Sequence, residues 1–343
     1  MLAMRPVARV ELGAFPTPLE RGSDLGEVLG VDDLWIKRDD LTGYSWGGNK
    51  VRTIEFILGD AIAQESDCLV VCGGSTSNFA ALMAAACARH GIAVYHVCYG
   101  EVSHREPIAL AFSLAAGATV MFTGSANRAS MDDAAKQCVN DLRAKGRRPY
   151  LVPRGGATVV GALGYAHAAG EFRQQLADVG MRDVTVVIPV GSGGTIAGLV
   201  SGFIHDFENE NDTGAFNIEV VGVCVSRPPE ELSPMIDAMA TACGGGRGAL
   251  RSVHCKWRLV DGRGAGFGVC DRHEEMFIDE ITRRSRLLVD TTYNGKAMIW
   301  LGDSLSRPAG SVVYWHTGGF LAVADRAANR ITQPPAKSRD GMT

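Results

Sequence analysis

The sequence predicts an α/β protein whose mostly parallel sheets are flanked by helices and divided between two lobes. Short apolar runs alternate with longer amphipathic stretches, which is the pattern of βαβ units. Glycine-rich segments stand at several of the corners between them. The chain has 343 residues, which is enough for two lobes at about 150 residues per domain.

The clearest βαβ unit lies between residues 68 and 98. Cys68–Cys72 reads CLVVC, a continuous apolar run typical of a buried strand. Phe79–His90 is rich in alanine and is followed by Gly91, so we expect a helix that ends there. Ile92–Cys98 is again apolar and predicts the next strand. Two strands joined by a helix in this way are expected to pair in parallel.

The same alternation continues toward the C-terminus. The expected strands are Ala118–Phe122, Val184–Val190, Ile218–Val225 and Ser311–Trp315. The expected helices are Met131–Lys145, Gly161–Ala177 and Ile196–Phe203, with one more that begins at Val51. In open parallel sheets, ligands bind where the carboxyl ends of strands meet the N-termini of helices. Functional residues are therefore expected in the glycine-rich corners.

These elements predict a division of the chain into two lobes. We expect residues 55–160 to form the small domain. Residues 1–54 and 161–330 together would form the large, ligand-binding domain. Residues 331–343 are polar and contain two prolines and a glycine, so they predict a disordered tail.

Composition excludes several classes of partner and site. The net charge is −4, with 34 basic and 38 acidic residues, so neither a nucleic-acid partner nor an acidic membrane surface is expected. No apolar run reaches the roughly 18 residues of a membrane-spanning helix. The nine cysteines include no CxxC pair and the chain has no secretory signal, which predicts reduced thiols and a cytoplasmic location. The eight histidines lack HxH or HxxxH spacing, so no metal site is expected.

The first of three glycine-rich corners presents a lysine directly before a helix. Its sequence is Gly47-Gly48-Asn49-Lys50. Helix N-termini disfavour cations. A lysine that forms a Schiff base with an aldehyde avoids this penalty, because its amine becomes an imine nitrogen. The alternative is a surface lysine in a flexible turn, and this corner alone does not decide between them.

The second corner predicts a phosphate site. Gly191, Ser192, Gly193, Gly194 and Thr195 stand between a predicted strand and a predicted helix. Free backbone amides and hydroxyls at a helix N-terminus bind phosphate. The corner matches neither GxxxxGK[ST] nor the dinucleotide fingerprint, so a single phosphomonoester fits better than ATP or NAD. Glycines that merely allow tight packing of helix on strand are the alternative.

The third corner is Gly73-Gly74-Ser75-Thr76-Ser77-Asn78, again between a strand and a helix. Ser77 or Asn78 could cap the helix that follows. Capping is compatible with function, because the remaining free amides could bind a substrate carboxylate.

The three corners together resemble a known family. WIKRDDLTG and GGNK are followed in order by GGSTSN, VGSGGTIAG, YNGKAM from Tyr293, and HTGG from His316. This series resembles the D-cysteine desulfhydrase and 1-aminocyclopropane-1-carboxylate deaminase family. Its members are fold-type II pyridoxal-phosphate enzymes, which are tryptophan-synthase-β-like. The resemblance runs from about Phe15 to Ala324.

The resemblance implies pyridoxal 5′-phosphate as cofactor and gives roles to residues around it. Lys50 would hold the cofactor as a Schiff base and carry protons. Asn78 would hydrogen-bond the 3′ oxygen, Gly191–Thr195 would bind the phosphate, and Thr317 would approach the pyridine nitrogen. Tyr293 would lie beside the ring and could act on the substrate.

The resemblance also implies a set of substrate contacts. Ser77 would sit beside the substrate carboxylate, with a further role in catalysis. The other predicted substrate-binding residues are Ser75, Thr76, Phe79 and Phe267.

The chain departs from the family pattern at five positions. Thr76 and Phe79 replace a glutamine and a histidine in the third corner, and Thr53 replaces a second lysine that helps to hold the phosphate. Phe267 stands where a tyrosine is usual. Asn294 replaces the glutamate that deaminases place against the pyridine nitrogen, which together with HTGG favours the desulfhydrase side. A less polar pocket is expected to change the accepted substrate.

The resulting hypothesis is a lyase or deaminase that acts on a small β-substituted amino acid. It would catalyse α,β-elimination to ammonia and a 2-oxo acid, in a role specialised for a biosynthetic pathway. A β-replacement synthase, a 1-aminocyclopropane-1-carboxylate deaminase and a catalytically silent cofactor-binding homologue are the alternatives. A homodimer is the expectation from the family.

Overall fold

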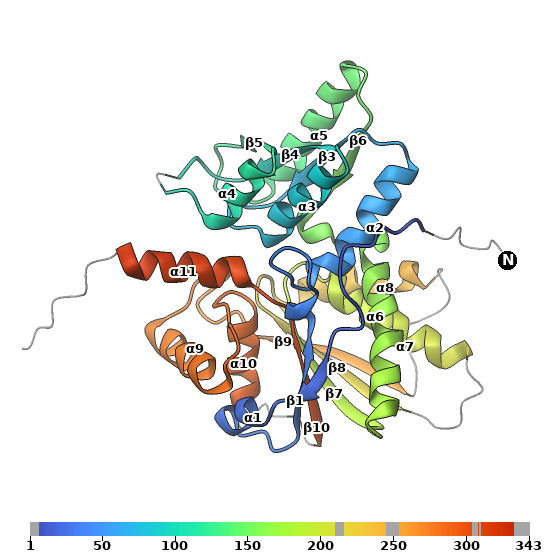
Figure 1. Cartoon of the computed structure of the whole chain (residues 1–343), viewed down its shortest axis with the longest axis vertical. Coiled ribbons are helices and arrows are strands. Elements are labelled where there is room, and N and C mark those ends of the chain that lie inside the picture. Colours follow the sequence, from blue (N-terminus) through green and yellow to red (C-terminus); the bar gives the residue numbers. More distant parts are fainter. Residues whose placement is uncertain are drawn as a thin grey trace, which may run out of the picture.

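Two sheets flanked by helices organise the chain (Figure 1). The computed structural model describes residues 7–103, 105–209, 216–244, 254–303, 308 and 310–332. The larger sheet runs in the order β1 (Leu19–Arg21), β2 (Leu34–Arg38), β10 (Ser311–His316), β7 (Asp183–Val190), β8 (Asn217–Cys224) and β9 (Cys255–Asp261). The smaller sheet runs in the order β5 (Thr119–Phe122), β4 (Ala93–Cys98), β3 (Cys68–Cys72) and β6 (Pro149–Val152). Neighbouring strands are parallel except for β1 and β2, which confirms the predicted α/β class.

The helices divide between the two sheets. The smaller sheet carries α3 (Asn78–Arg89), α4 (Ile108–Ala115) and α5 (Ser130–Ala144). Around the larger sheet lie α1 (Ser23–Leu29), α6 (Val159–Asp178), α7 (Gly194–Asn209), α8 (Pro229–Cys243), α9 (Arg272–Ser285) and α10 (Asn294–Gly302). Two helices link the sets: α2 (Lys50–Ala63) packs on α3 and α6, and α11 (Phe320–Thr332) packs on α4. The domain boundaries near residues 55 and 160 stay a prediction, and residues 333–343 of the predicted tail lie outside the described residues.

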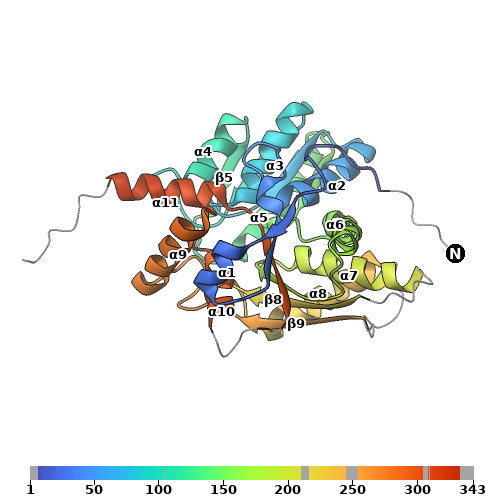
Figure 2. The same cartoon turned by 60° about the horizontal axis from the view of Figure 1, so that its bottom comes forward.

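The larger sheet is covered on both faces, which explains its apolar strands. In β7, Val186 and Ile188 join a buried cluster with Phe172 of α6 and Phe203 of α7. Val187 points the other way, into a cluster with residues of α1, α9 and α10. Figure 2 shows these two helix groups on opposite sides of the strands. Successive side chains of a strand alternate between faces, so a strand covered on both faces must be apolar throughout.

The smaller sheet follows the same rule. Leu69 and Val71 of β3 pack into a cluster with α2 and α3, while Val70 packs against Met131 and Leu142 of α5. The cysteines of CLVVC take part in this packing as free, buried thiols. Burial raises the pKa of the Cys72 thiol to about 11, so the thiol is protonated near neutral pH.

The carboxyl ends of the strands in the two sheets face a common region between the lobes. Arg128, which follows β5, places its guanidinium carbon 4.1 Å from the ring centre of Phe267, which follows β9. Gly155, which follows β6, is so close to the loop after β7 that a Cβ on it would lie 2.8 Å from Ser192 Oγ. Loops that follow strands of both sheets, among them the second corner and the segment of Phe267, therefore meet between the two sheets, and we call this region the inter-lobe site.

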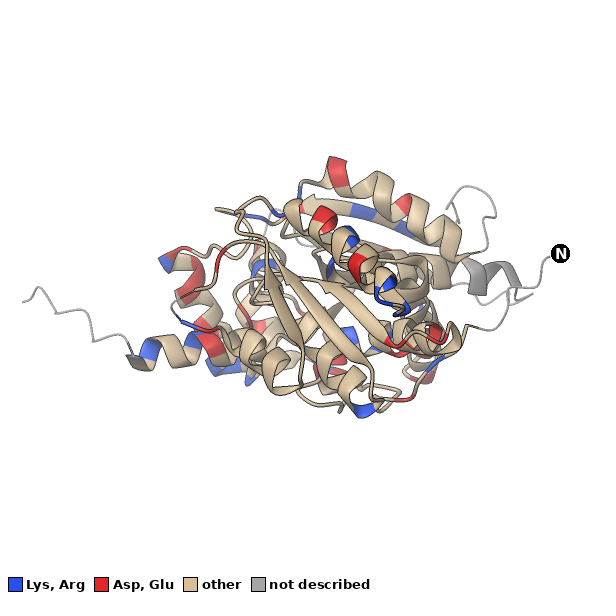
Figure 3. Cartoon of the chain, turned by 90° about the horizontal axis from the view of Figure 1, so that it is seen from above, with Lys and Arg blue, Asp and Glu red and all other residues tan. Residues whose placement is uncertain are grey.

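Surface charge is mixed. Figure 3 shows acidic and basic residues interspersed along the helices in a view from above. No helix in the described part of the chain is both long enough and apolar enough to span a membrane.

Candidate active site

Hydrogen bonds tie the first and second corners and the loop after β10 together. The backbone N–H of Asn49 donates to the carbonyl oxygen of Thr317 over 3.0 Å. The side-chain amide of Asn49 donates to Thr195 Oγ1 over 3.2 Å. A Cβ on Gly48, whose φ is +95°, would lie 3.2 Å from the Thr317 carbonyl, so this close approach requires glycine. Segments far apart in the sequence are thereby fixed around one point.

Lys50 is the first residue of α2, at this point of convergence. Its amine has no hydrogen-bond or ion-pair partner among the residues that the structure describes. Burial lowers the pKa of Lys50 from 10.5 to about 8, because the charged form loses its hydration. An amine that is partly uncharged near neutral pH is suited to attack an aldehyde.

The second corner offers a set of free backbone donors. Ser192 and Gly193 lead into α7, which begins at Gly194. The backbone N–H groups of residues 191–195 have no acceptor in the described part of the chain. Backbone amides without acceptors at a helix N-terminus form an anion site. This arrangement fits a phosphate group.

The third corner provides further polar groups. Ser77 caps α3, its Oγ accepting from the N–H of Ala80 over 3.2 Å. The adjacent Asn78 has a buried Oδ1 that finds no hydrogen-bond partner in the described part of the chain. Ser75 is half-buried and Thr76 is exposed, and their backbone amides have no acceptor among the described residues. These groups fit a cofactor hydroxyl and a substrate carboxylate.

Asn294 holds Thr317 in place. It is buried, and its Oδ1 accepts from the Thr317 N–H over 3.1 Å and from the Thr317 hydroxyl over 3.2 Å. Its amide donates to Asp290 Oδ1 and to the Gly318 carbonyl, each over 2.8 Å. The hydrogen-bonding groups of Asn294 are therefore engaged within the protein, and Thr317 is the residue that they orient.

Tyr293 lies beside the second corner. A Cβ on Gly191 would lie 3.0 Å from its ring, and the ring of Phe267 packs edge-on against it with centres 5.8 Å apart. Burial and the charge of Asp290 raise the pKa of Tyr293 to about 12. Its hydroxyl is thus protonated near neutral pH and can donate a proton or a hydrogen bond.

The segment that carries Phe267 is held in place by Lys296. Lys296, on α10, is buried, and its amine donates to the carbonyl oxygens of Arg263 and Gly266. Neither Lys296 nor Asp290, which caps the start of α10 by accepting from the N–H of Tyr293, was singled out from the sequence. The aspartate was detectable, because an acidic residue shortly before a helix is a capping signal.

Phe79 does not take the place expected for a substrate contact. Only 2% of it is exposed, and it packs in the core cluster with Ile57 and Met83. A Cβ on Gly156 would lie 2.7 Å from its ring. An aromatic residue at the second position of α3 faces the core here, so the structure gives Phe79 a packing role.

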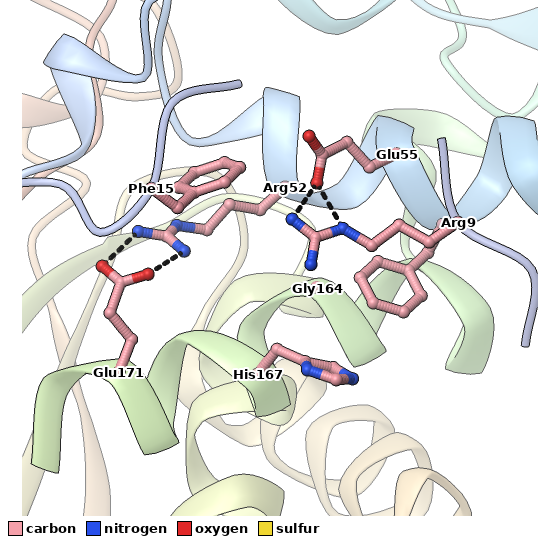
Figure 4. Close-up of a pocket in the computed structure, with 8 residues that line it drawn as sticks. Arg9, Phe15, Arg52, Glu55, Gly164, His167 and Glu171 are labelled. Carbon is pink, nitrogen blue, oxygen red and sulfur yellow. Dashed lines mark hydrogen bonds and ion pairs between the residues drawn. The ribbon is translucent and has the colours of Figure 1, made fainter. Parts of the chain in front are cut away.

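Thr53, at the position of the second lysine, carries no charge, and Arg52 does not direct its charge to the second corner. Thr53 is buried, and a Cβ on Gly161 would lie 2.9 Å from its methyl group. Arg52 points to the opposite side of α2 and pairs with Asp39 and Glu171, each at 2.9 Å. Figure 4 shows the guanidinium directed at Glu171, beside a polar cavity of about 140 Å³. None of the predicted site residues lines that cavity.

Three arginines near the inter-lobe site were also missed from the sequence. Arg128, Arg154 and Arg227 follow β5, β6 and β8 respectively. Single arginines in loops carry no motif, and only the shared position after parallel strands could have indicated them.

Comparison with known proteins identifies the family. The profile described as "Pyridoxal-phosphate dependent enzyme" matches residues 10–318. A D-cysteine desulfhydrase of Salmonella choleraesuis is 32% identical over 329 residues, covering 92% of this chain and 95% of its own length. A Pyrococcus furiosus protein provisionally assigned as a 1-aminocyclopropane-1-carboxylate deaminase is 31% identical, covering 91% and 92%.

Solved structures agree on the fold. A crystal structure described as an ACC deaminase homologue superimposes with a TM-score of 0.79 at 28% identity, covering 95% of this chain and 99% of the other. A fungal L-serine ammonia-lyase from Rhizomucor miehei shares the fold, with a TM-score of 0.58 at 18% identity, covering 92% and 98%. The predicted fold-type II architecture is thereby confirmed. The chain belongs to the family of pyridoxal-phosphate dependent enzymes, and pyridoxal phosphate is its cofactor.

Proposed function

We propose that this enzyme is a lyase or deaminase that eliminates the β-substituent of a small amino acid and releases ammonia and a 2-oxo acid. The observation that carries the proposal is the amine of the half-buried Lys50, whose pKa desolvation lowers to about 8 and which lies among loops with free backbone donors. Relatives named D-cysteine desulfhydrase support elimination as the reaction type.

The residues around Lys50 have separate tasks in this proposal. Lys50 would hold the cofactor, and its amine would take the proton from the substrate Cα as a general base. Bound pyridoxal phosphate supplies the electron sink for the negative charge that develops at Cα. The amides of residues 191–195 bind the cofactor phosphate, and the Asn78 side chain meets the oxygen on its ring.

The substrate is held and protonated by groups on both lobes. The amides of Ser75 and Thr76 and the hydroxyl of Ser77 bind its carboxylate, next to the N-terminus of α3. Tyr293 donates a proton to the leaving group, which its raised pKa permits near neutral pH. Thr317, oriented by Asn294, would offer a neutral group to the pyridine nitrogen.

Deamination of 1-aminocyclopropane-1-carboxylate is the second candidate, because the Pyrococcus relative is assigned that activity. The engagement of Asn294 with Thr317 and Asp290 favours elimination over ring opening, since no acid stands at this position. A β-replacement synthase would use the same residues. We further propose a cytoplasmic homodimer.

Trapping the lysine tests the site, and product analysis tests the reaction. Borohydride reduction of the purified yellow enzyme should fix the cofactor on Lys50, as read by peptide mass spectrometry. Lys50→Ala should keep the fold and lose both the label and nearly all turnover. A panel of D- and L-amino acids with β leaving groups should yield 2-oxo acid and ammonia. Label on another lysine, or products without ammonia, would refute the proposal.

A further inference from the structure

Three arginines surround the inter-lobe site from three different strand ends. Arg128 lies between β5 and α5, Arg154 in the turn after β6, and Arg227 in the loop after β8. Carboxyl ends of parallel strands point to one edge of their sheet, and here the edges of both sheets face the same region. The loops that carry these arginines therefore come from both lobes to the inter-lobe site.

Arg128 reaches across from the small lobe to the catalytic face of the large lobe. Its guanidinium stacks on the ring of Phe267 at 4.1 Å and lies 5.6 Å from the ring of Tyr99. The Phe267 ring in turn packs edge-on against Tyr293. Stacking on an aromatic ring fixes the plane of a guanidinium and leaves its N–H donors at the edge free for a ligand. The Phe267 ring thus lies between Arg128 and Tyr293, the proposed proton donor.

Arg227 and Arg154 flank the second corner. Ser226, directly before Arg227, donates its hydroxyl to the Gly191 carbonyl over 2.7 Å. Gly155, directly after Arg154, packs against Ser192. Both arginines are therefore attached to backbone that touches the start of the phosphate-binding loop, where Tyr293 also lies close to Gly191.

The positive charges are incompletely balanced. No carboxylate of the described residues lies within 4 Å of the Arg128 or Arg227 guanidinium, and the nearest polar partner of Arg227 is the sulfur of Met235 at 3.1 Å. Arg154 pairs at the surface with Asp132 over 3.4 Å. Burial lowers the pKa of Arg227, as do the charges of Arg154 and Arg128, with Glu231 opposing them. Cations that repel one another without a partner are costly unless a ligand supplies the negative charge.

We infer that the β-substituent of the natural substrate carries a negative charge, as a phosphate, sulfonate or carboxylate group, and that Arg128 and Arg227 bind it. This inference rests on the proposed elimination reaction. For a phosphorylated substrate, the base removes the Cα proton and the Cβ–O bond breaks with its electron pair going to the phosphate. The released enamine then reacts with water to give pyruvate and ammonium. The two arginines would stabilise the departing anion.

The test compares substrates that differ in charge. The holoenzyme is assayed for pyruvate with O-phosphoserine, O-acetylserine and β-chloroalanine, each as the D and the L form. Because a hydrogen bond to a charged group contributes about 1.5–3 kcal/mol, Arg128→Gln and Arg227→Gln should each lower the ratio of kcat/KM for O-phosphoserine to that for β-chloroalanine by about 10- to 150-fold. Arg143→Gln removes an equally charged, exposed side chain from α5 and should leave the ratio unchanged.

Each remaining outcome overturns one specific idea. An unchanged ratio in both site variants, or a wild-type preference for O-acetylserine over O-phosphoserine, overturns the inference. Loss of cofactor from the variants with an unchanged ratio assigns the arginines to the cofactor phosphate and also overturns it. If β-chloroalanine is not turned over, the proposed function fails separately. Dissociation constants for O-phosphoserine and O-acetylserine, measured from the cofactor absorbance, then decide the charge preference.

Discussion

Lys50 shows how one residue acquires its chemistry from its position. It begins α2, where the exposed N–H groups of the helix repel a cation, and its neighbour Asn49 is hydrogen-bonded to Thr195 after β7 and to Thr317 after β10. The helix N-terminus acts against the charged amine, and burial lowers its pKa to about 8. The same lysine in a surface turn would stay protonated until much higher pH.

The first prediction concerns the pH dependence of cofactor capture by Lys50. A pKa of about 8 leaves roughly 1% of the amine uncharged at pH 6 and about half at pH 8. The rate at which the apoenzyme binds pyridoxal phosphate covalently should therefore rise with pH to a midpoint near 8. Stopped-flow absorbance measures this rate, with a lysine peptide of ordinary pKa as the reference. A midpoint near 10.5 for the enzyme would show that Lys50 is not desolvated.

At the scale of an element, the N-terminus of α7 depends on one glycine. Gly193 has a φ of +92°, in the left-handed region, and a Cβ on it would lie 2.9 Å from Ile236 of α8. The loop thus obtains its free amides from a backbone conformation that other residues adopt only with strain. Since Thr53 and Arg52 face elsewhere, these neutral donors are the main anchor proposed for the phosphate.

The second prediction follows from this geometry. Gly193→Ala should weaken binding of pyridoxal phosphate by about tenfold or more, because strain of roughly 1–3 kcal/mol and the contact with Ile236 displace the amides. Equilibrium dialysis or fluorescence titration of the apoenzyme measures the Kd. Gly180→Ala is the matched control, since Gly180 has a φ of +72° and nothing within 4 Å of its Cβ position. Equal cofactor affinity in the two variants would contradict the proposed phosphate site.

Elements were predictable to different degrees for identifiable reasons. The strands of continuous apolar residues were predicted almost to the residue, as Cys68–Cys72 shows. For α7 the sequence predicted Ile196–Phe203, but the helix begins at Gly194 and continues to Asn209. Polar residues at the end of a helix have the composition of a loop, so the local pattern does not distinguish the two.

The residues of the candidate site were also predictable to different degrees. Lys50, Asn78 and the second corner lie in glycine-rich turns between strand and helix, where the chemistry depends on local backbone and is visible in sequence. The direction of a side chain from a helix surface depends on tertiary packing. The burial of Phe79 in the core and the stacking of Arg128 on Phe267 were therefore not predictable.

At the scale of the whole molecule, a buried polar network joins the start of α2 to the larger sheet. Asp39 is fully buried and accepts hydrogen bonds from Arg52 on α2, Tyr165 on α6 and Trp315 on β10. Arg52 also pairs with Glu171, as does the buried Lys37. Because Arg52 lies two residues after Lys50, this network fixes the helix that carries the reactive amine.

The third prediction concerns the stability that Asp39 contributes. Burial alone would raise the pKa of Asp39, but the charge and hydrogen bonds of Arg52, with Lys37 and Tyr165, lower it to about 2. A carboxylate whose pKa is lower in the folded state stabilises the protein above its unfolded pKa of about 4 and loses this effect as the pH falls toward 2. Asp39→Asn should therefore reduce the free energy of unfolding by about 3–5 kcal/mol at pH 7, because the buried Arg52 guanidinium loses one of the carboxylates that neutralise its charge.

Urea unfolding at pH 7, 5 and 3.5 measures this contribution. The destabilisation by Asp39→Asn should be similar at pH 7 and 5. It should be smaller at pH 3.5, where falling pH begins to remove the stabilisation that the wild-type carboxylate provides. Asp32→Asn, on the exposed turn before β2, should change stability by no more than about 0.5 kcal/mol. If Asp39→Asn were as mild as Asp32→Asn at pH 7, the position of α2 would have to be set by apolar packing against α3 and α6. The polar network would then have no part in placing Lys50.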